Sequence, residues 1–180
     1  MQNDAIVRPC QQQFIYHLFK PMKNNFNFTE SEMAFVTKAE QYCATGEQCR
    51  SAVRDKLLTW GAGQDLRERV VDYLTENDFI NEERFCRIYC ESKMHLQKWG
   101  RVKIAYQLRS KRIDNTTINK ALQEIDEEEY HKILTTLTEN KNSSIVEPDN
   151  KKRRAKLMSF LSSHGFTISE IENAVAALGL

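Results

Sequence analysis

From residue 30 onward, apolar residues recur at the three- and four-residue spacing of an amphipathic helix almost throughout the chain. Three sets of apolar positions share nearly the same spacing, and their corresponding leucines, Leu57, Leu108 and Leu161, are 51 and 53 residues apart. Each set predicts a helix that ends, one apolar residue that enters the core, and a second helix that begins. The apolar residues expected at these breaks are Ala62, Ile113 and Phe166.

A further helix precedes each of these pairs, so the pattern predicts an all-α chain of tandem three-helix repeats in an elongated, curved array. The expected organisation is an N-terminal extension, loose or docked through its aromatic residues, over 1–29 and modules over 30–80, 81–125 and 126–180. The third module contains an insertion over 138–150 that is rich in Asn, Ser and Lys and predicts a flexible loop.

Capping residues support these boundaries. Thr29 with Glu32, and Thr167 with Glu170, have the spacing of a capping box at a helix N-terminus. Gly165 precedes the third break residue, where glycine suits a left-handed helix end.

Composition narrows the class of protein. Six Gly and three Pro among 180 residues leave few turns, which argues against an all-β fold. The longest apolar run, Ala174–Leu180, is too short to span a membrane. The first residues show no basic leader, and five cysteines without export predict reduced thiols and a cytoplasmic protein.

Three segments carry a resemblance to a known family. Residues 77–85 (NDFINEERF), residues 98–104 (KWGRVKI) and residues 49–58 (CRSAVRDKLL) are similar to the repeat modules of RecX proteins, and the likeness extends over about residues 31–180. It departs from the family where Arg101 and Val102 replace a common proline, where Arg112 replaces a glycine, and where Cys49 replaces a serine.

The resemblance implies a function. RecX proteins are all-helical, bind the RecA recombinase filament and usually limit its strand-exchange and co-protease activities, and some members also bind DNA. It therefore implies a monomeric, non-enzymatic regulator without cofactors that acts in homologous recombination, DNA repair and the SOS response. Single- or double-stranded DNA, contacted without sequence preference, is the expected second partner.

Charge points to a site in the second module. The chain has 26 Lys and Arg against 25 Asp and Glu, a net charge of +1. Between residues 84 and 112, however, nine cations accompany one acid, Glu91, which gives a local charge of +8 and favours an anionic partner. The alternative is a solvated face with no partner. The candidate RecA- or DNA-binding residues are Arg84, Arg87, Lys93, Lys98, Arg101, Lys103, Arg109, Lys111 and Arg112.

A second basic cluster begins the helix that follows the expected loop. Cations at a helix start oppose its dipole, so a role other than helix stability is one interpretation, and a solvated loop end is the other. The residues of this second basic cluster are Lys151, Lys152, Arg153, Arg154 and Lys156.

The tryptophan, the cysteines and a run of acids suggest base stacking or metal binding, but each also has a structural explanation. Trp99 lies at a helix break in the basic stretch, where it would stack on a nucleic-acid base or fill a hinge. Cys86 and Cys90 are one turn apart but lack a matching second pair, so buried thiols are expected and no metal site. The acids at 126–129 are explained by a helix start.

Two further hypotheses stay open beside the RecA regulator. One is a helix-turn-helix DNA-binding protein with residues 101–112 as the reading helix. The other is a helical scaffold for an acidic protein.

Overall fold

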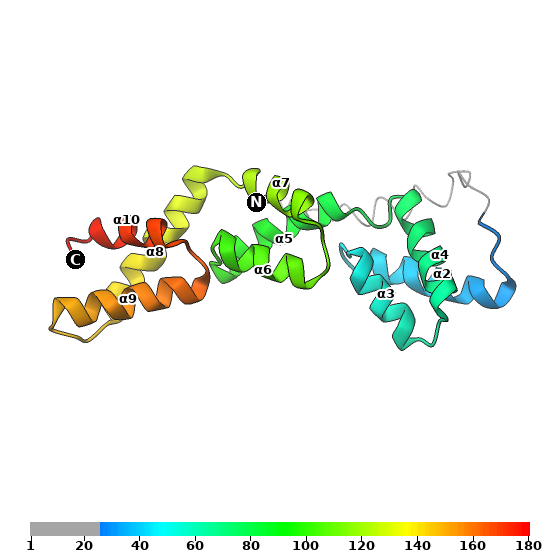
Figure 1. The fold of residues 1–180 in the computed structure, drawn as a ribbon, viewed down its shortest axis with the longest axis horizontal. Coiled ribbons are helices and arrows are strands. Elements are labelled where there is room, and N and C mark those ends of the chain that lie inside the picture. Colours follow the sequence, from blue (N-terminus) through cyan, green and yellow to red (C-terminus); the bar gives the residue numbers. More distant parts are fainter. Residues whose placement is uncertain (1–25) are drawn as a thin grey trace, which may run out of the picture. The chain divides into compact units, whose positions relative to one another are not determined.

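Every regular element of the structure, a computed structural model that describes residues 26–180, is a helix (Figure 1). The prediction of an all-α chain of three-helix repeats is confirmed for this range, and residues 1–25 of the expected extension lie outside it. No helix in this range is long and apolar enough to cross a membrane. The helices are α2 (Glu30–Ala44), α3 (Arg50–Thr59), α4 (Gln64–Glu76), α5 (Glu82–Gln97), α6 (Arg101–Ser110), α7 (Asn115–Gln123), α8 (Glu127–Ser144), α9 (Asn150–His164) and α10 (Ile168–Ala176).

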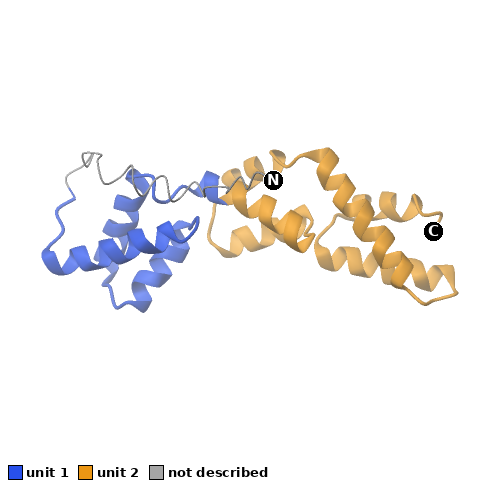
Figure 2. Cartoon of the chain, turned by 180° about the vertical axis from the view of Figure 1, so that it is seen from behind, with its two compact units in different colours: residues 1–85 blue, residues 86–180 orange. Residues whose placement is uncertain are grey.

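The chain divides into two compact units, Met1–Phe85 and Cys86–Leu180 (Figure 2). The division falls within α5. Helices α2, α3 and α4 belong to unit 1, whereas α6 to α10 belong to unit 2. Most of predicted module 2 and all of predicted module 3 therefore share one unit.

The repeated breaks are built as the spacing predicts. Their apolar residues are all buried: Ala62, Ile113 and Phe166 expose 4, 5 and 4% of their surface. Each follows a residue in the left-handed conformation, namely Gly61 (φ 88°), Arg112 (φ 61°) and Gly165 (φ 85°). Arg112 adopts the glycine conformation despite its side chain, which costs a non-glycine residue about 1–2 kcal/mol.

The first described residues pack on unit 1. Phe26 and Phe28 each lie edge-on to Tyr73 of α4, with ring centroids 5.6 and 5.7 Å apart. These two aromatic residues of the predicted extension are therefore docked on the core formed by α2, α3 and α4.

The loop predicted over residues 138–150 is wrong in its first half, because α8 continues to Ser144. Thr138 is 1% exposed, and its hydroxyl donates to the carbonyl of Leu134 at 2.7 Å. Ser143 donates in the same way to Glu139, so the polar side chains that suggested a loop are satisfied within the helix. The connection to α9 shortens to residues 145–149.

Within unit 2, the end of α9 meets the start of α6. The amides of Gly100 and Val102 donate to the carbonyls of His164 and Gly165 at 2.8 and 3.0 Å. A Cβ on Gly100 would lie 2.3 Å from the Gly165 oxygen, so only glycine permits this approach. The free carbonyls at the end of one helix thus satisfy free amides at the start of another.

Candidate anion-binding surface of unit 2

Three lysines of unit 2 gather around two aromatic rings. The ammonium of Lys93 lies 5.2 Å from the ring centroid of Tyr89 and 5.1 Å from that of Trp99. Lys103 lies 4.9 Å from the Trp99 centroid, and Lys111 lies 5.8 Å from the Tyr89 centroid. All four distances are within the range of a cation–π attraction. We call Tyr89, Lys93, Trp99, Lys103 and Lys111 the lysine–aromatic strip.

Local backbone structure assembles the strip. Tyr89 and Lys93 are one turn apart on α5, so they lie on the same helix face. Helix α5 ends at Gln97, and the next residue, Lys98, has a left-handed φ of 54°. The Trp99 amide donates back to the Lys93 carbonyl at 3.2 Å. This helix-ending pattern brings the indole to the lysine one and a half turns before it.

The end of α9 fixes one lysine of the strip. The Lys103 ammonium donates to the backbone carbonyl of Ser163 at 2.9 Å. The Lys103 ammonium is therefore positioned by two groups, the Trp99 ring and the Ser163 carbonyl.

The Trp99 ring already contacts two lysine ammonium groups. Two ammonium groups lie about 5 Å from the centre of the Trp99 ring, so a base could stack there only by displacing a lysine. The arrangement favours the interpretation of Trp99 as a structural filler over stacking. It presents ammonium donors, which suit the oxygens of phosphates or carboxylates.

Two of the predicted site residues are held in ion pairs with carboxylates. Arg84, in unit 1, bonds Glu47 at 2.8 Å and Asp78 at 3.0 Å, and its side chain is only 15% exposed. Arg101 is 22% exposed and bonds Glu127 at 2.7 Å and Glu170 at 3.5 Å.

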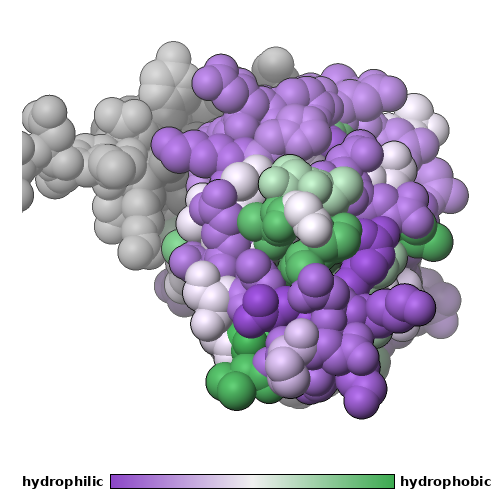
Figure 3. Space-filling view, turned by 90° about the vertical axis from the view of Figure 1, so that its left-hand side faces the viewer, coloured by the Kyte–Doolittle hydropathy of each residue, from purple (hydrophilic) through white to green (hydrophobic). Residues whose placement is uncertain are grey.

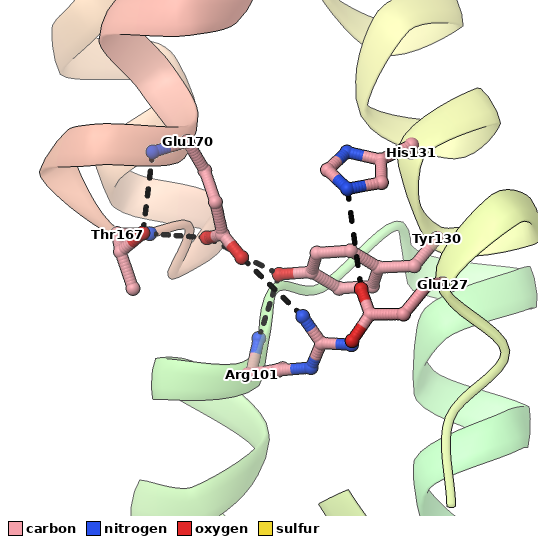
Figure 4. A network of polar contacts seen from close by, with 6 residues as sticks. All are labelled: Arg101, Glu127, Tyr130, His131, Thr167 and Glu170. Carbon is pink, nitrogen blue, oxygen red and sulfur yellow. Dashed lines mark hydrogen bonds and ion pairs between the residues drawn. The ribbon is translucent and has the colours of Figure 1, made fainter. Parts of the chain in front are cut away.

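Arg101 is the centre of a network that joins α6, α8 and α10 (Figure 4). Its guanidinium lies 4.1 Å from the ring centroid of the buried Tyr130, and its amide donates to the Tyr130 hydroxyl at 3.2 Å. Burial raises the pKa of Tyr130, so this phenol stays neutral. Glu170 also closes the predicted capping box with Thr167.

This network and the α9 carbonyls occupy the start of α6. The amides of Gly100, Arg101 and Val102 donate to the last residue of α9, to Tyr130 of α8 and to Gly165 of the α9–α10 turn, respectively. The N-terminus of α6 is therefore satisfied within unit 2, and the anion-binding capacity of the surface belongs to the lysine side chains.

The remaining candidates of the basic stretch are not among the lysines that define the strip. Arg87, Lys98, Arg109 and Arg112 are exposed. Lys98 lines a cavity of about 360 Å³ together with His95, Glu129, Lys132, Ile133, Thr136, Leu137 and Asn140. Arg109 donates to the side chain of Asn115 at 3.0 Å.

The second basic cluster divides in two. Arg153 and Arg154 donate to the carbonyls of Ile145 and Leu180, and Lys156 pairs with Glu147 at 2.8 Å. The side chains of Lys151 and Lys152 are exposed, while their amides donate to the N-cap Asp149. Most of these cations therefore bond partners within unit 2.

The two basic clusters are separated along α9. Lys103 binds at Ser163 near the C-terminal end, and Lys151 lies 12 residues earlier at the N-terminal end, a helical distance of roughly 18 Å. Seen from the end of unit 2 that holds α9 and α10, the surface is mostly hydrophilic, with a group of hydrophobic residues near the centre of the view and others toward its edges (Figure 3).

Sequence reasoning missed Tyr89 as part of the site. The available signal was its spacing of four residues from Lys93, which places an aromatic ring and a cation side by side on α5.

Among the described residues, no group of three or more His, Cys, Asp or Glu side chains is placed to hold a metal ion. The thiols of Cys86 and Cys90 are buried, and burial raises the pKa of Cys90 to about 11.

Comparison with known proteins identifies the family. Residues 81–122, which contain α5, α6 and all but the last residue of α7, match the family profile described as RecX, second three-helix domain. A crystal structure of RecX from Lactobacillus salivarius superposes with a TM-score of 0.76 at 20% identity, covering 84% of this chain and 99% of that chain.

Curated relatives agree with this match. Regulatory protein RecX of Clostridium tetani is 36% identical over 128 residues, which are 70% of this chain and 58% of that relative's length. Regulatory protein RecX of Clostridium botulinum (strain Eklund 17B / Type B) is 30% identical over 158 residues, 87% of this chain and 72% of the relative. The chain belongs to the RecX family of regulatory proteins.

Proposed function

We propose that this protein binds the RecA filament and inhibits its recombinase and co-protease activities through the lysine–aromatic strip, as a binding protein and not as an enzyme. The observation that carries the proposal is the set of three lysines held by two aromatic rings on one unit. Membership of the RecX family supports RecA as the partner, because strand exchange by RecA is the activity that the family is known to limit.

Electrostatics supports an anionic target for the strip. The Lys93 and Lys103 nitrogens are no more than about 10 Å apart, because both lie near the centre of one ring. Holding two like charges together raises the local potential, and a phosphate backbone or a row of carboxylates relieves that repulsion. The filament offers both chemistries in its DNA and its protein.

Inhibition would follow from occupancy. A chain bound along the filament through unit 2 would contact neighbouring RecA subunits and the DNA that they hold. Strand exchange and subunit addition both need those surfaces, so a bound regulator would slow both.

The test measures single-strand-dependent ATP hydrolysis and strand exchange by RecA with increasing amounts of this protein. We expect the wild-type chain to inhibit and a Lys93→Gln, Lys103→Gln, Lys111→Gln variant to inhibit less. Lys38→Gln is the matched control, since Lys38 is an exposed cation on α2 of unit 1. An unchanged RecA reaction at several-fold excess of the wild-type protein contradicts the proposal.

DNA binding without RecA is the second candidate function, and the strip also supports it. Ammonium groups positioned by rings contact phosphates without reading bases, so binding would be independent of sequence. A sequence-specific footprint on duplex DNA would instead indicate the helix-turn-helix alternative.

A further inference from the structure

The solvent-facing side of α6 carries two large hydrophobic residues. Val102 and Tyr106 are one turn apart and expose 53 and 66% of their surface, while Ile104 and Leu108 on the opposite face are fully buried. Arg109 follows on the same side and is also exposed. An aliphatic, an aromatic and a cationic side chain thus lie together facing solvent. We call Val102, Tyr106 and Arg109 the outer face of α6.

The repeats provide an internal comparison. Because Leu57, Leu108 and Leu161 are equivalent, the positions that correspond to Tyr106 are Asp55 in α3 and Ser159 in α9. Both are ordinary polar residues of a solvated helix. The exposed aromatic residue is therefore a property of α6 and not of the repeat.

The charged residues within α6 and at its two ends are all cations. Residues 98–113 contain six cations and no acid. Arg101 is paired with Glu127 and Glu170, whereas Arg109 is exposed one turn after Tyr106 on α6. A partner surface that fits this face would offer an apolar depression bordered by carboxylates.

A protein fits this face better than a nucleic acid does. A valine side chain gains from burial in an apolar depression, which a solvated phosphate backbone does not provide. Tyrosine and arginine are the residue types enriched at the energetic centres of protein–protein interfaces. Of the strip, Lys103 lies on α6 next to Val102 in the sequence, and the ammonium groups of the strip are the groups suited to phosphates.

We propose that the outer face of α6 is a protein-docking site, distinct from the lysine–aromatic strip, for an acidic surface with an apolar depression. The inference rests on the proposed function and assigns a different partner to each surface. The outer face contacts the RecA subunits, and the strip contacts the DNA that they hold. Tyr106 fills the depression, and Arg109 pairs with carboxylates at its border.

The experiment uses the full-length chain with Val102→Ala and Tyr106→Ser, which install the residues at the equivalent positions of α9, Ala155 and Ser159. The matched control is Leu58→Ser, because Leu58 is 58% exposed on α3 and its α9 equivalent is Ser162. Circular dichroism confirms that each variant is folded. Inhibition of RecA strand exchange and affinity for a single-stranded oligonucleotide are then measured separately.

We expect the Val102→Ala, Tyr106→Ser variant to need at least about tenfold more protein for half-inhibition, with oligonucleotide affinity within about twofold of wild type. A photo-crosslinking amino acid at position 106 should label RecA within filaments. Equal loss of oligonucleotide affinity, or labelling of DNA alone, would show a nucleic-acid face and overturn the inference.

The inference and the proposed function fail differently. If the wild-type chain leaves RecA unaffected, the proposed function is wrong and the inference falls with it. If the wild-type chain inhibits and the Val102→Ala, Tyr106→Ser variant inhibits equally well, only the docking site is wrong.

Discussion

At the scale of single residues, Trp99 holds two cations of the proposed anion-binding surface next to one ring. Its ring attracts Lys93 and Lys103, which would otherwise repel each other. Under the proposed function, the lysines would be ordered before an anion arrives, and less side-chain entropy would be lost on binding.

This role predicts a loss of affinity from an uncharged substitution. Trp99→Leu should weaken binding of a single-stranded oligonucleotide by roughly threefold to tenfold, because the ring that holds two ammonium groups is gone. Trp99→Phe keeps a ring and should lose less. Fluorescence anisotropy at low salt measures both, and equal affinity of the leucine variant would refute this role.

The lysines predict a specific salt dependence. For single strands the logarithm of the affinity falls with the logarithm of salt by about 0.7 per phosphate contacted. Replacing Lys93 by glutamine should therefore reduce that slope by about 0.7, whereas Lys38→Gln should leave it unchanged. A slope that stays constant in the Lys93 variant would place the phosphate contact elsewhere.

At the scale of elements, two glycines in equivalent turns have different tasks. Gly61 and Gly165 share a left-handed φ, but a Cβ would meet nothing within 4 Å at Gly61 and would lie 2.5 Å from the Lys103 nitrogen at Gly165. The first position requires only a conformation, while the second also requires close approach between two helices.

Alanine substitutions at these two glycines should therefore lower the stability of the fold by different amounts. Gly61→Ala should cost about 1–2 kcal/mol from backbone strain alone. Gly165→Ala should cost clearly more, because it also separates the end of α9 from the start of α6, where the Gly100 and Val102 amides are bonded. Hydrogen exchange of these two amides is the measurement; protection that survives in Gly165→Ala would contradict the expectation.

Acid should weaken the contact between α3 and α4. Arg54 bonds both carboxylate oxygens of Glu68, at 2.7 and 2.6 Å, and these bonds hold the pKa of Glu68 below its usual value of 4.5. A carboxyl whose pKa is lower in the folded state stabilises it above that usual value, and the contribution is lost as the pH falls through the lowered pKa.

Glu68→Gln should therefore flatten the decline in stability of the chain below about pH 4.5, since the variant has no such proton to take up. Urea unfolding between neutral and acid pH measures the decline. Asp65→Asn, at an exposed position of the same helix, is the control, and a parallel decline in wild type and Glu68→Gln would refute the contribution.

Sequence periodicity predicted the elements well and the site only in outline. The break residues and their caps were readable because helix ends are set by neighbours within a few positions, as at Thr167 and Glu170. Charge density indicated the region of the strip. The partners of Arg84 and Arg101 could not be predicted, because Glu47 and Glu170 lie 37 and 69 positions away in the sequence.

At the scale of the whole molecule, the two units have separate stabilising networks. Unit 1 uses Arg84 with Glu47 and Asp78, and unit 2 uses Arg101 with Glu127 and Glu170. Loss of either arginine should therefore weaken one unit and spare the other.

Arg101→Met should destabilise unit 2 by roughly 1–3 kcal/mol, because the half-buried carboxylate of Glu170 loses its charged partner. Arg109→Met removes the same charge from an exposed position and should change stability little. Hydrogen exchange by mass spectrometry should show faster exchange in α6, α8 and α10 and unchanged exchange in α2 to α4. Uniform acceleration along the described chain would contradict two separate networks.

The carbonyls of His164 and Gly165 that complete α6 have a consequence for dissecting this protein. A recombinant fragment that stopped before α9 would keep the strip's five residues yet leave the opening turn of α6 frayed and the Lys103 head group untethered. The affinity of this fragment for an anion would therefore be lower than the affinity of the intact chain. Truncated fragments should therefore end at the boundaries of the two compact units and not at the boundaries of single three-helix modules.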